Sequence, residues 1–181
     1  GMMNGRITVK SATGDGSTFT ITLSEIPYLT SHNSLDHGNV IHPESVEFEK
    51  ALILVVDDIE VNRRVIRDIL NGTAIEVLDA ASGSSALDIM KTMLPDLVIT
   101  DLRMPGMNGF ELLGIIKSDK KMKSVPVIAY SASVMKEQKE RIYNSEFTGL
   151  LVKPVSITDL YTELANILPY RIKEGRGEIK Q

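Results

Sequence analysis

Between residues 51 and 168, short apolar runs alternate with longer stretches in which apolar residues recur every three or four positions. The first run, residues 51–56, is apolar throughout, as expected of a strand buried on both faces of a sheet. Residues 60–70 follow it with the spacing of an amphipathic helix. Five such units in succession favour an α/β fold, with a parallel sheet, helices on both faces and right-handed crossovers. The other predicted strands are residues 74–78, 97–99, 125–129 and 150–152, and the other predicted helices are residues 83–94, 109–117, 134–145 and 157–168.

Polar side chains stand where four of these strands end. They are Asp57 and Asp58 after the first strand, Asp101 after the third, Ser131 after the fourth and Lys153 after the fifth. Open parallel sheets bind ligands at the carboxyl ends of their strands, near the point where strand order reverses. We therefore expect these side chains to gather at one edge of the sheet.

The residue types at this edge predict a chemistry. Three carboxylates repel one another and require a cation, and ligands that are all oxygen suit a hard ion such as Mg²⁺. A carboxylate such as Asp101 can act as a nucleophile toward phosphorus. The ammonium of Lys153 and the hydroxyl of Ser131 could then neutralise the charge of an incoming phosphoryl group. Each residue alone could have a purely structural role, as a helix cap or a surface group. Only their joint occurrence indicates a site.

Residues 51–168 resemble a response-regulator receiver domain. The matching stretches are residues 53–58 (ILVVDD), 101–109 (DLRMPGMNG), 129–132 (AYSA) and 151–154 (LVKP). The resemblance implies a five-stranded, doubly wound, flavodoxin-like sheet with strand order 2-1-3-4-5. It also implies a phosphoacceptor in two-component or phosphorelay signalling, which takes a phosphoryl group from a histidine with the help of Mg²⁺.

By that resemblance, Asp101 is the phosphoacceptor, Ser131 is the switch hydroxyl and Lys153 pairs with the phosphoryl oxygens. The resemblance further implies a metal site in which the Mg²⁺ ligands are Asp57, Asp58, Asp101 and the backbone carbonyl of Arg103. One position departs from the family pattern. Many receivers carry an aromatic residue three positions before the lysine, and here that residue is Leu150.

Residues 1–26 predict a short β-hairpin, because apolar and polar residues alternate on both sides of a turn-rich segment. Residues 5–11 and 14–20 resemble the last two strands of a histidine-kinase ATPase domain, without the segments that hold ATP in that family. An unrelated hairpin extension is the alternative. The resemblance implies the C-terminal fragment of a hybrid sensor histidine kinase, cytoplasmic itself and with a membrane-anchored parent. An isolated hairpin is marginal in water, so we expect it to dock onto the receiver or to pair with a second copy in a dimer.

The remaining segments and the composition set limits on function. Residues 27–50 are expected to be a linker and residues 169–181 a disordered tail. The net charge of −4 argues against a nucleic-acid partner, and no apolar run reaches the roughly 18 residues of a membrane span. The expected partners are a histidine-kinase donor domain, from the same parent chain, and a histidine phosphotransfer protein.

Two other functions are weighed against the receiver. An aspartyl-phosphate hydrolase usually places a second Asp two residues after its nucleophile, and here that position holds Arg103, which cannot serve as an acid or base. An interaction module without phosphotransfer is opposed by the full set of site residues. As an enzyme, the fragment would catalyse only its own phosphorylation and dephosphorylation.

Overall fold

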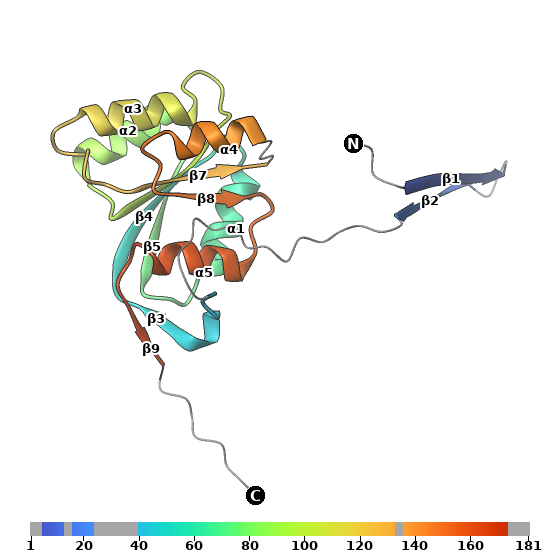
Figure 1. Ribbon diagram of the computed structural model, residues 1–181, viewed down its shortest axis with the longest axis horizontal. Helices are drawn as coiled ribbons and strands as arrows, with labels where there is room; N and C mark the ends of the chain where they lie inside the picture. The colour runs from blue at the N-terminus through green and yellow to red at the C-terminus, as the bar shows by residue number, and fades with distance from the viewer. Residues whose placement is uncertain (1–4, 13–15, 24–39, 133–135, 174–181) are drawn as a thin grey trace, which may run out of the picture. The chain divides into compact units, whose positions relative to one another are not determined.

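The computed structural model describes residues 5–12, 16–23, 40–132 and 136–173 (Figure 1). The chain divides into two compact units, Gly1–Asn33 and Ser34–Gln181. Among the described residues, no helix has the length and apolar character to cross a membrane.

The first unit is a two-stranded antiparallel hairpin. Strand β1 (Gly5–Ala12) pairs with β2 (Gly16–Leu23) along their whole lengths, and Val9 lies opposite Phe19. This confirms the hairpin that the alternating pattern predicted, while the turn between the strands lies outside the described residues. The predicted docking or pairing of the hairpin remains a prediction.

The second unit is built on a five-stranded parallel sheet. Its spatial order is β5-β4-β6-β7-β8, which confirms the predicted order 2-1-3-4-5 and the flavodoxin-like fold. From β4 the chain passes outward to β5 and then returns across β4 to β6, so the strand order reverses beside β4. The strands are β4 (Ala51–Val56), β5 (Ile75–Ala80), β6 (Leu97–Asp101), β7 (Val127–Ser131) and β8 (Gly149–Val152).

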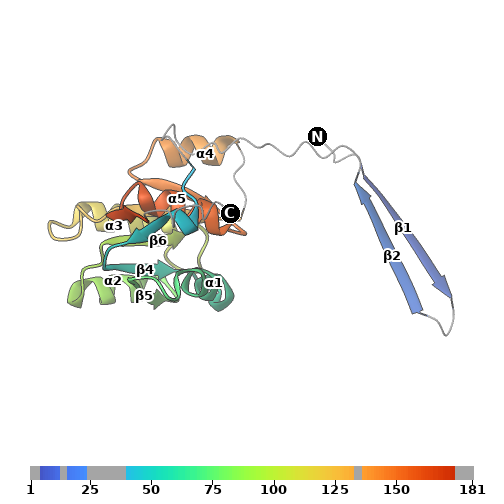
Figure 2. The same cartoon turned by 90° about the horizontal axis from the view of Figure 1, so that it is seen from below.

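Helices cover both faces of this sheet (Figures 1 and 2). Alternate residues of each strand point to opposite faces. In β4, Ile53 and Val55 pack in the core cluster with α1 and α5, and Leu54 and Val56 pack in the one with α2 and α3. Helix α4 contributes Ile142 to a third, smaller cluster. The helices are α1 (Glu60–Leu70), α2 (Gly83–Thr92), α3 (Gly109–Ser118), α4 (Lys136–Tyr143) and α5 (Ile157–Ala165).

Three of the helices begin at residues whose side chains cap the first turn. Ser82 accepts a hydrogen bond from the Ser85 backbone, and Ser156 accepts one from the Asp159 backbone. Asn108 accepts two at the start of α3. Such caps satisfy N–H groups that have no partner within the helix. They fix where α2, α3 and α5 start, and therefore how long the loops above the strand ends are.

A second, two-stranded sheet corrects the expected linker and tail. Strand β3 (Val46–Phe48) pairs antiparallel with β9 (Tyr170–Ile172), and a 3-10 turn, η1 (Pro43–Ser45), precedes it. We call this pair the ribbon. The linker prediction for residues 27–50 was therefore wrong over 43–48, and the disorder prediction for 169–181 was wrong over 170–172. Residues 27–39 of the predicted linker and the last eight residues lie outside the described chain.

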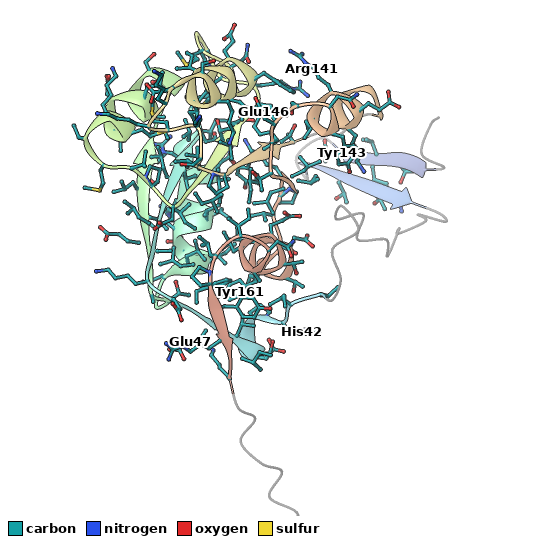
Figure 3. All side chains as sticks on the ribbon, turned by 60° about the vertical axis from the view of Figure 1, so that its left-hand side comes forward. His42, Glu47, Arg141, Tyr143, Glu146 and Tyr161 are labelled. Carbon is teal, nitrogen blue, oxygen red and sulfur yellow. The ribbon has the colours of Figure 1, made fainter. Side chains whose placement is uncertain are left out.

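Aromatic packing explains why such short strands are ordered. The ring of Phe48 lies 5.3 Å from that of Tyr161 on α5 and 6.3 Å from that of Tyr170 on β9, measured between centroids. Figure 3 shows Tyr161 between α5 and the ribbon. Val46 and Phe48 are both buried. Aromatic rings bury large areas and dominate core energetics, so a few of them hold strands that backbone pairing alone would not.

Candidate functional site

Three carboxylates meet at the point where the strand order reverses. Asp57 and Asp58 follow β4, and Asp101 is the last residue of β6. One oxygen of each lies within 4.8 Å of the others. Asp57 and Asp101 are buried, whereas Asp58 is exposed. The structure therefore brings the three predicted acidic residues together, with one of them open to solvent.

Asp57 is fully buried, and its carboxylate is held from several sides. Its oxygens accept hydrogen bonds from the backbone N–H of Ile59 at 2.9 Å and from the Asn62 amide at 3.0 and 3.1 Å. The Lys153 ammonium donates to Asp57 Oδ2 at 2.6 Å. Burying an ionised carboxylate is very unfavourable unless it is paired and hydrogen-bonded, and these partners meet that condition.

Asp101 shares the same ammonium. Lys153 Nζ lies 3.0 Å from Asp101 Oδ2, and the backbone N–H of Arg103 donates to Asp101 Oδ1 at 3.2 Å. The backbone behind Asp101 is tightly enclosed, because a Cβ at Gly109 would overlap the Asp101 carbonyl oxygen. Glycine at the first turn of α3 thus allows this helix to start directly against the end of β6.

Lys153 is carried to the site by β8 and anchored through its own backbone. Its N–H donates to the carbonyl of Ser131 at 2.8 Å, which continues the pairing of β7 with β8 beyond the strand end. Only 12% of the Lys153 side chain is exposed. The lysine therefore forms a charged bridge between Asp57 and Asp101 in a nearly closed environment.

Ser131 and Leu150 lie on the face of the sheet opposite to that of their strand neighbours Tyr130 and Leu151. Ser131 is the last residue of β7 and is buried. It is two residues from Ala129, which packs in the third core cluster with Ile142 of α4. Leu150, at the position that is often aromatic in receivers, packs against the same cluster. An aliphatic side chain therefore fills the space between β8 and α4.

A pocket of about 900 Å³ opens beside the acidic residues. Asp58 and Arg103 line it on the side of the site, and Phe110 and Arg141 are also part of its lining. The Arg141 guanidinium of α4 stacks on the ring of Phe110, 4.0 Å from the centroid. Solvent and a small solute can therefore approach Asp58 from this side.

Three residues that contact the site have no role predicted from the sequence. Asn62 and Arg63 lie on the first turns of α1, and Arg63 donates to the Asp57 carbonyl at 2.5 Å. Their position one turn beyond the Asp57-Asp58 pair was the available signal. The third is Tyr130, whose ring lies 4.6 Å from Lys153 Nζ. Burial, followed by the charges of Asp57 and Asp101, raises the pKa of the Tyr130 hydroxyl to about 12.

Comparison with known proteins identifies this arrangement. The family model for the response regulator receiver domain matches residues 53–165, more than half of the chain. The chain belongs to the response regulator receiver family. The match spans the strand ends that carry the acidic residues and the lysine, so the receiver resemblance is confirmed.

Individual relatives agree with this assignment. The polar-differentiation response regulator DivK of Brucella ovis is 32% identical over 105 residues, which are 58% of this chain and 85% of DivK. Among solved structures, the chemotaxis protein CheY4 of Vibrio cholerae has a TM-score of 0.62 and 30% identity, covering 66% of this chain and 99% of CheY4. The receiver domain of the Francisella response regulator 1452 has a TM-score of 0.59 and 29% identity, with 65% and 96% covered. The residues that the family model matches, 53–165, all lie in the second unit of the chain.

Proposed function

We propose that this receiver takes a phosphoryl group from a phosphohistidine onto Asp101. The observation that carries the proposal is the Lys153 ammonium bridging Asp57 and Asp101 beside a third carboxylate. An oxygen of Asp101 supplies the electron pair for the new P–O bond. The P–N bond breaks, and its electron pair returns to the imidazole, which takes up a proton from solvent. The product is an aspartyl phosphate.

The donor atoms at the site fit Mg²⁺. Asp57, Asp58 and Asp101 offer oxygens within 4.8 Å of one another, and hard cations prefer such ligands. We assign them as the protein ligands, together with the backbone carbonyl of Arg103. When bound, the ion neutralises charge on the phosphoryl oxygens. The exposure of Asp58 leaves one side of the site open to water and to the phosphoryl donor.

Lys153 and Ser131 complete the proposed reaction and its response. Lys153 already lies between the two buried carboxylates, so its ammonium can pass from Asp101 to a phosphoryl oxygen over a short distance. Ser131 ends the neighbouring strand, and its hydroxyl is assigned to bind another phosphoryl oxygen. Its inward movement would bias the surface formed by residues 131–155 between two arrangements, which is how a local charge change becomes a signal.

The experiment is phosphorylation by a small donor, acetyl phosphate, in the presence of Mg²⁺, followed by intact mass measurement. Wild type is expected to gain the mass of one phosphoryl group, and Asp101→Asn is expected to gain none. Asp88→Asn, an exposed substitution on α2, is the matched control and should behave as wild type. A mass gain that persists in Asp101→Asn, or its absence from wild type, would overturn the assignment.

We further propose that the donor histidine belongs to the same parent chain, a hybrid sensor kinase. The support is the likeness of residues 5–11 and 14–20 to the last strands of a kinase ATPase domain, together with the hairpin pairing of β1 with β2. A histidine phosphotransfer protein would then receive the phosphoryl group from Asp101. The sequence encoded upstream of this chain decides the matter, because a kinase core there supports the proposal and an unrelated domain rejects it.

A further inference from the structure

Tyr130 lies on the same face of the sheet as Asp101 and Lys153. In the pairing of β6 with β7, Tyr130 is the direct partner of Asp101, and in the pairing of β7 with β8 it is the partner of Leu151. Lys153 follows Leu151 by two residues, so it continues that face. Tyr130 therefore occupies the strand position between the acceptor and the lysine.

Its contacts make Tyr130 more than a core residue. The ring is 2% exposed, and its centroid lies 4.6 Å from Lys153 Nζ. The same ammonium reaches Asp57 at 2.6 Å and Asp101 at 3.0 Å. The electron-rich face of an aromatic ring attracts an ammonium, most strongly where water is excluded. Two carboxylates and one ring thus fix the end of a side chain that has four rotatable bonds.

We propose that Tyr130 is a positioning residue that holds the Lys153 ammonium between Asp57 and Asp101. The inference rests on the proposed function, since Lys153 matters only if it meets the phosphoryl group. A ring is suited to this role because it attracts the ammonium without offering another anionic oxygen that would compete with the phosphoryl group. An aliphatic residue in its place would fill the core but leave the lysine freer to turn toward solvent.

Two substitutions separate the ring from the bulk of the side chain. Tyr130→Phe keeps the ring and removes the hydroxyl, whereas Tyr130→Leu keeps an apolar side chain and removes the ring. Tyr130→Met, which adapts its shape to core gaps, replaces Tyr130→Leu if that variant does not fold. The matched control is Tyr161→Leu, which removes a ring from the same core cluster at the distant Phe48 contact.

The first measurement needs no phosphorylation. A ring close to the lysine shifts the NMR signals of the Lys153 ε-methylene protons upfield through its ring current. Wild type, Tyr130→Phe and Tyr161→Leu are expected to share this shift, and Tyr130→Leu is expected to lose it. An unshifted Lys153 signal in wild type, or an unchanged shift in Tyr130→Leu, would overturn the inference whatever the protein does with phosphate.

The second measurement is the rate of phosphorylation by acetyl phosphate with saturating Mg²⁺. Tyr130→Leu is expected to be slower by about tenfold, the size of effect that one desolvated cation–π contact supports, with Tyr130→Phe and Tyr161→Leu within about twofold of wild type. Equal slowing in Tyr130→Phe would assign the effect to the hydroxyl and reject the inference. If wild type shows the ring-current shift but is not phosphorylated, the proposed function fails and the placement of Lys153 by Tyr130 stands.

Discussion

The two ends of the parallel sheet are built on opposite principles. The carboxyl end of the strands, which we call the reactive end, holds a largely buried ion-pair cluster. Its Lys153 ammonium lies 2.6 Å from the Asp57 carboxylate and 3.0 Å from the Asp101 carboxylate. At the amino end, strand β3 of the ribbon buries Val46 and Phe48, and the Phe48 ring packs beside the rings of Tyr161 on α5 and Tyr170 on β9. Burying charge is unfavourable, and burying aromatic surface is favourable. The difference indicates that the amino end stabilises the fold, and that this stabilisation offsets the cost of burying charge at the reactive end.

The comparison predicts that substitutions at the two ends change the free energy of unfolding in opposite directions. Removing a side chain from the ribbon should destabilise the fold and leave the chemistry unchanged. Removing the exposed carboxylate of Asp58, which Lys153 does not bridge, should cost little stability or even raise it, while it abolishes ion binding. Proteins in which function opposes stability show this pattern.

The largest expected effect is that of Phe48→Ala. Phe48 is 3% exposed and contacts two rings, so its loss leaves a cavity that the ribbon cannot fill. The free energy of unfolding should fall by about 3–5 kcal/mol, as measured by urea denaturation. In the protein that remains folded, the phosphorylation rate should match wild type. A loss of stability below about 1 kcal/mol would show that the ribbon adds little.

Glu49→Ala is the control for that substitution. Glu49 follows the ribbon strand directly, and its carboxylate lies 3.3 Å from Arg171 on β9 in an ion pair that is open to solvent. Exposed pairs of this kind contribute about 0–1 kcal/mol. A small effect here beside a large one at Phe48 would assign the stabilisation to apolar burial rather than to pairing of charges across the ribbon.

The carboxyl of Glu163 provides a second comparison with Asp57, because it is buried and forms no ion pair with a cation among the described residues. It is 9% exposed on α5 and faces the start of β8, where a Cβ at Gly149 would overlap its carboxylate. Burial, followed by the charge of Asp159, raises its pKa from 4.5 to about 7. The folded chain therefore keeps a proton that the unfolded chain releases, and stability falls as the pH rises from about 4.5 to about 7.

Glu163→Gln should remove this pH dependence, because an amide stays neutral. The variant is expected to match wild type near pH 4, below the pKa of the unfolded chain, and to exceed it by about 1–3 kcal/mol at pH 8, where the folded carboxyl has also lost its proton. Urea denaturation across this pH range measures the difference. Glu47→Gln, on the exposed side of β3, should show no such divergence. A difference that does not change with pH would contradict the raised pKa.

The arrangement of residues at the carboxyl end of the sheet was predicted from the sequence better than the ribbon at its amino end. Asp57, Asp101 and Lys153 each lie at the carboxyl end of a strand, and the topology of a parallel sheet alone places such residues together. The ribbon strands are three residues long and pair from opposite ends of the domain, as Val46 does with Ile172, so neither had a periodic pattern to reveal it. Contacts between distant segments decide such elements, and one segment read alone does not contain them.

Tyr130 shows a different limit. In the sequence it directly follows the apolar strand predicted over 125–129, where an aromatic residue is usually core. Its place beside Asp101 follows only from the register of β6 with β7. Once the strand order is known, alternation gives the face that Tyr130, Asp101 and Lys153 share. The order was predictable, but the register depends on side-chain packing across the whole sheet.

The smallest expected effect is that of Asp58→Asn. It tests whether removal of a negative charge at the reactive end raises or lowers the free energy of unfolding. Asp58 adds a third negative charge beside Asp57 and Asp101, which Lys153 bridges. Without Mg²⁺, the variant should be more stable than wild type by about 1 kcal/mol, the size of the interaction between two unit charges about 4 Å apart in water, to which Asp58 is exposed. Mg²⁺ should then stabilise wild type by mass action and leave the variant unchanged, as measured by thermal denaturation with and without the ion.

Asp68→Asn on α1 controls for the loss of a surface charge, because Asp68 is exposed and pairs with Arg64 at 3.6 Å. It should lower stability slightly or not at all, and it should keep the response to Mg²⁺. If Asp58→Asn is less stable than wild type without the ion, then the three carboxylates do not repel one another enough to matter. The reactive end would in that case be neutral for stability, and the contrast between the two ends would rest on the ribbon alone.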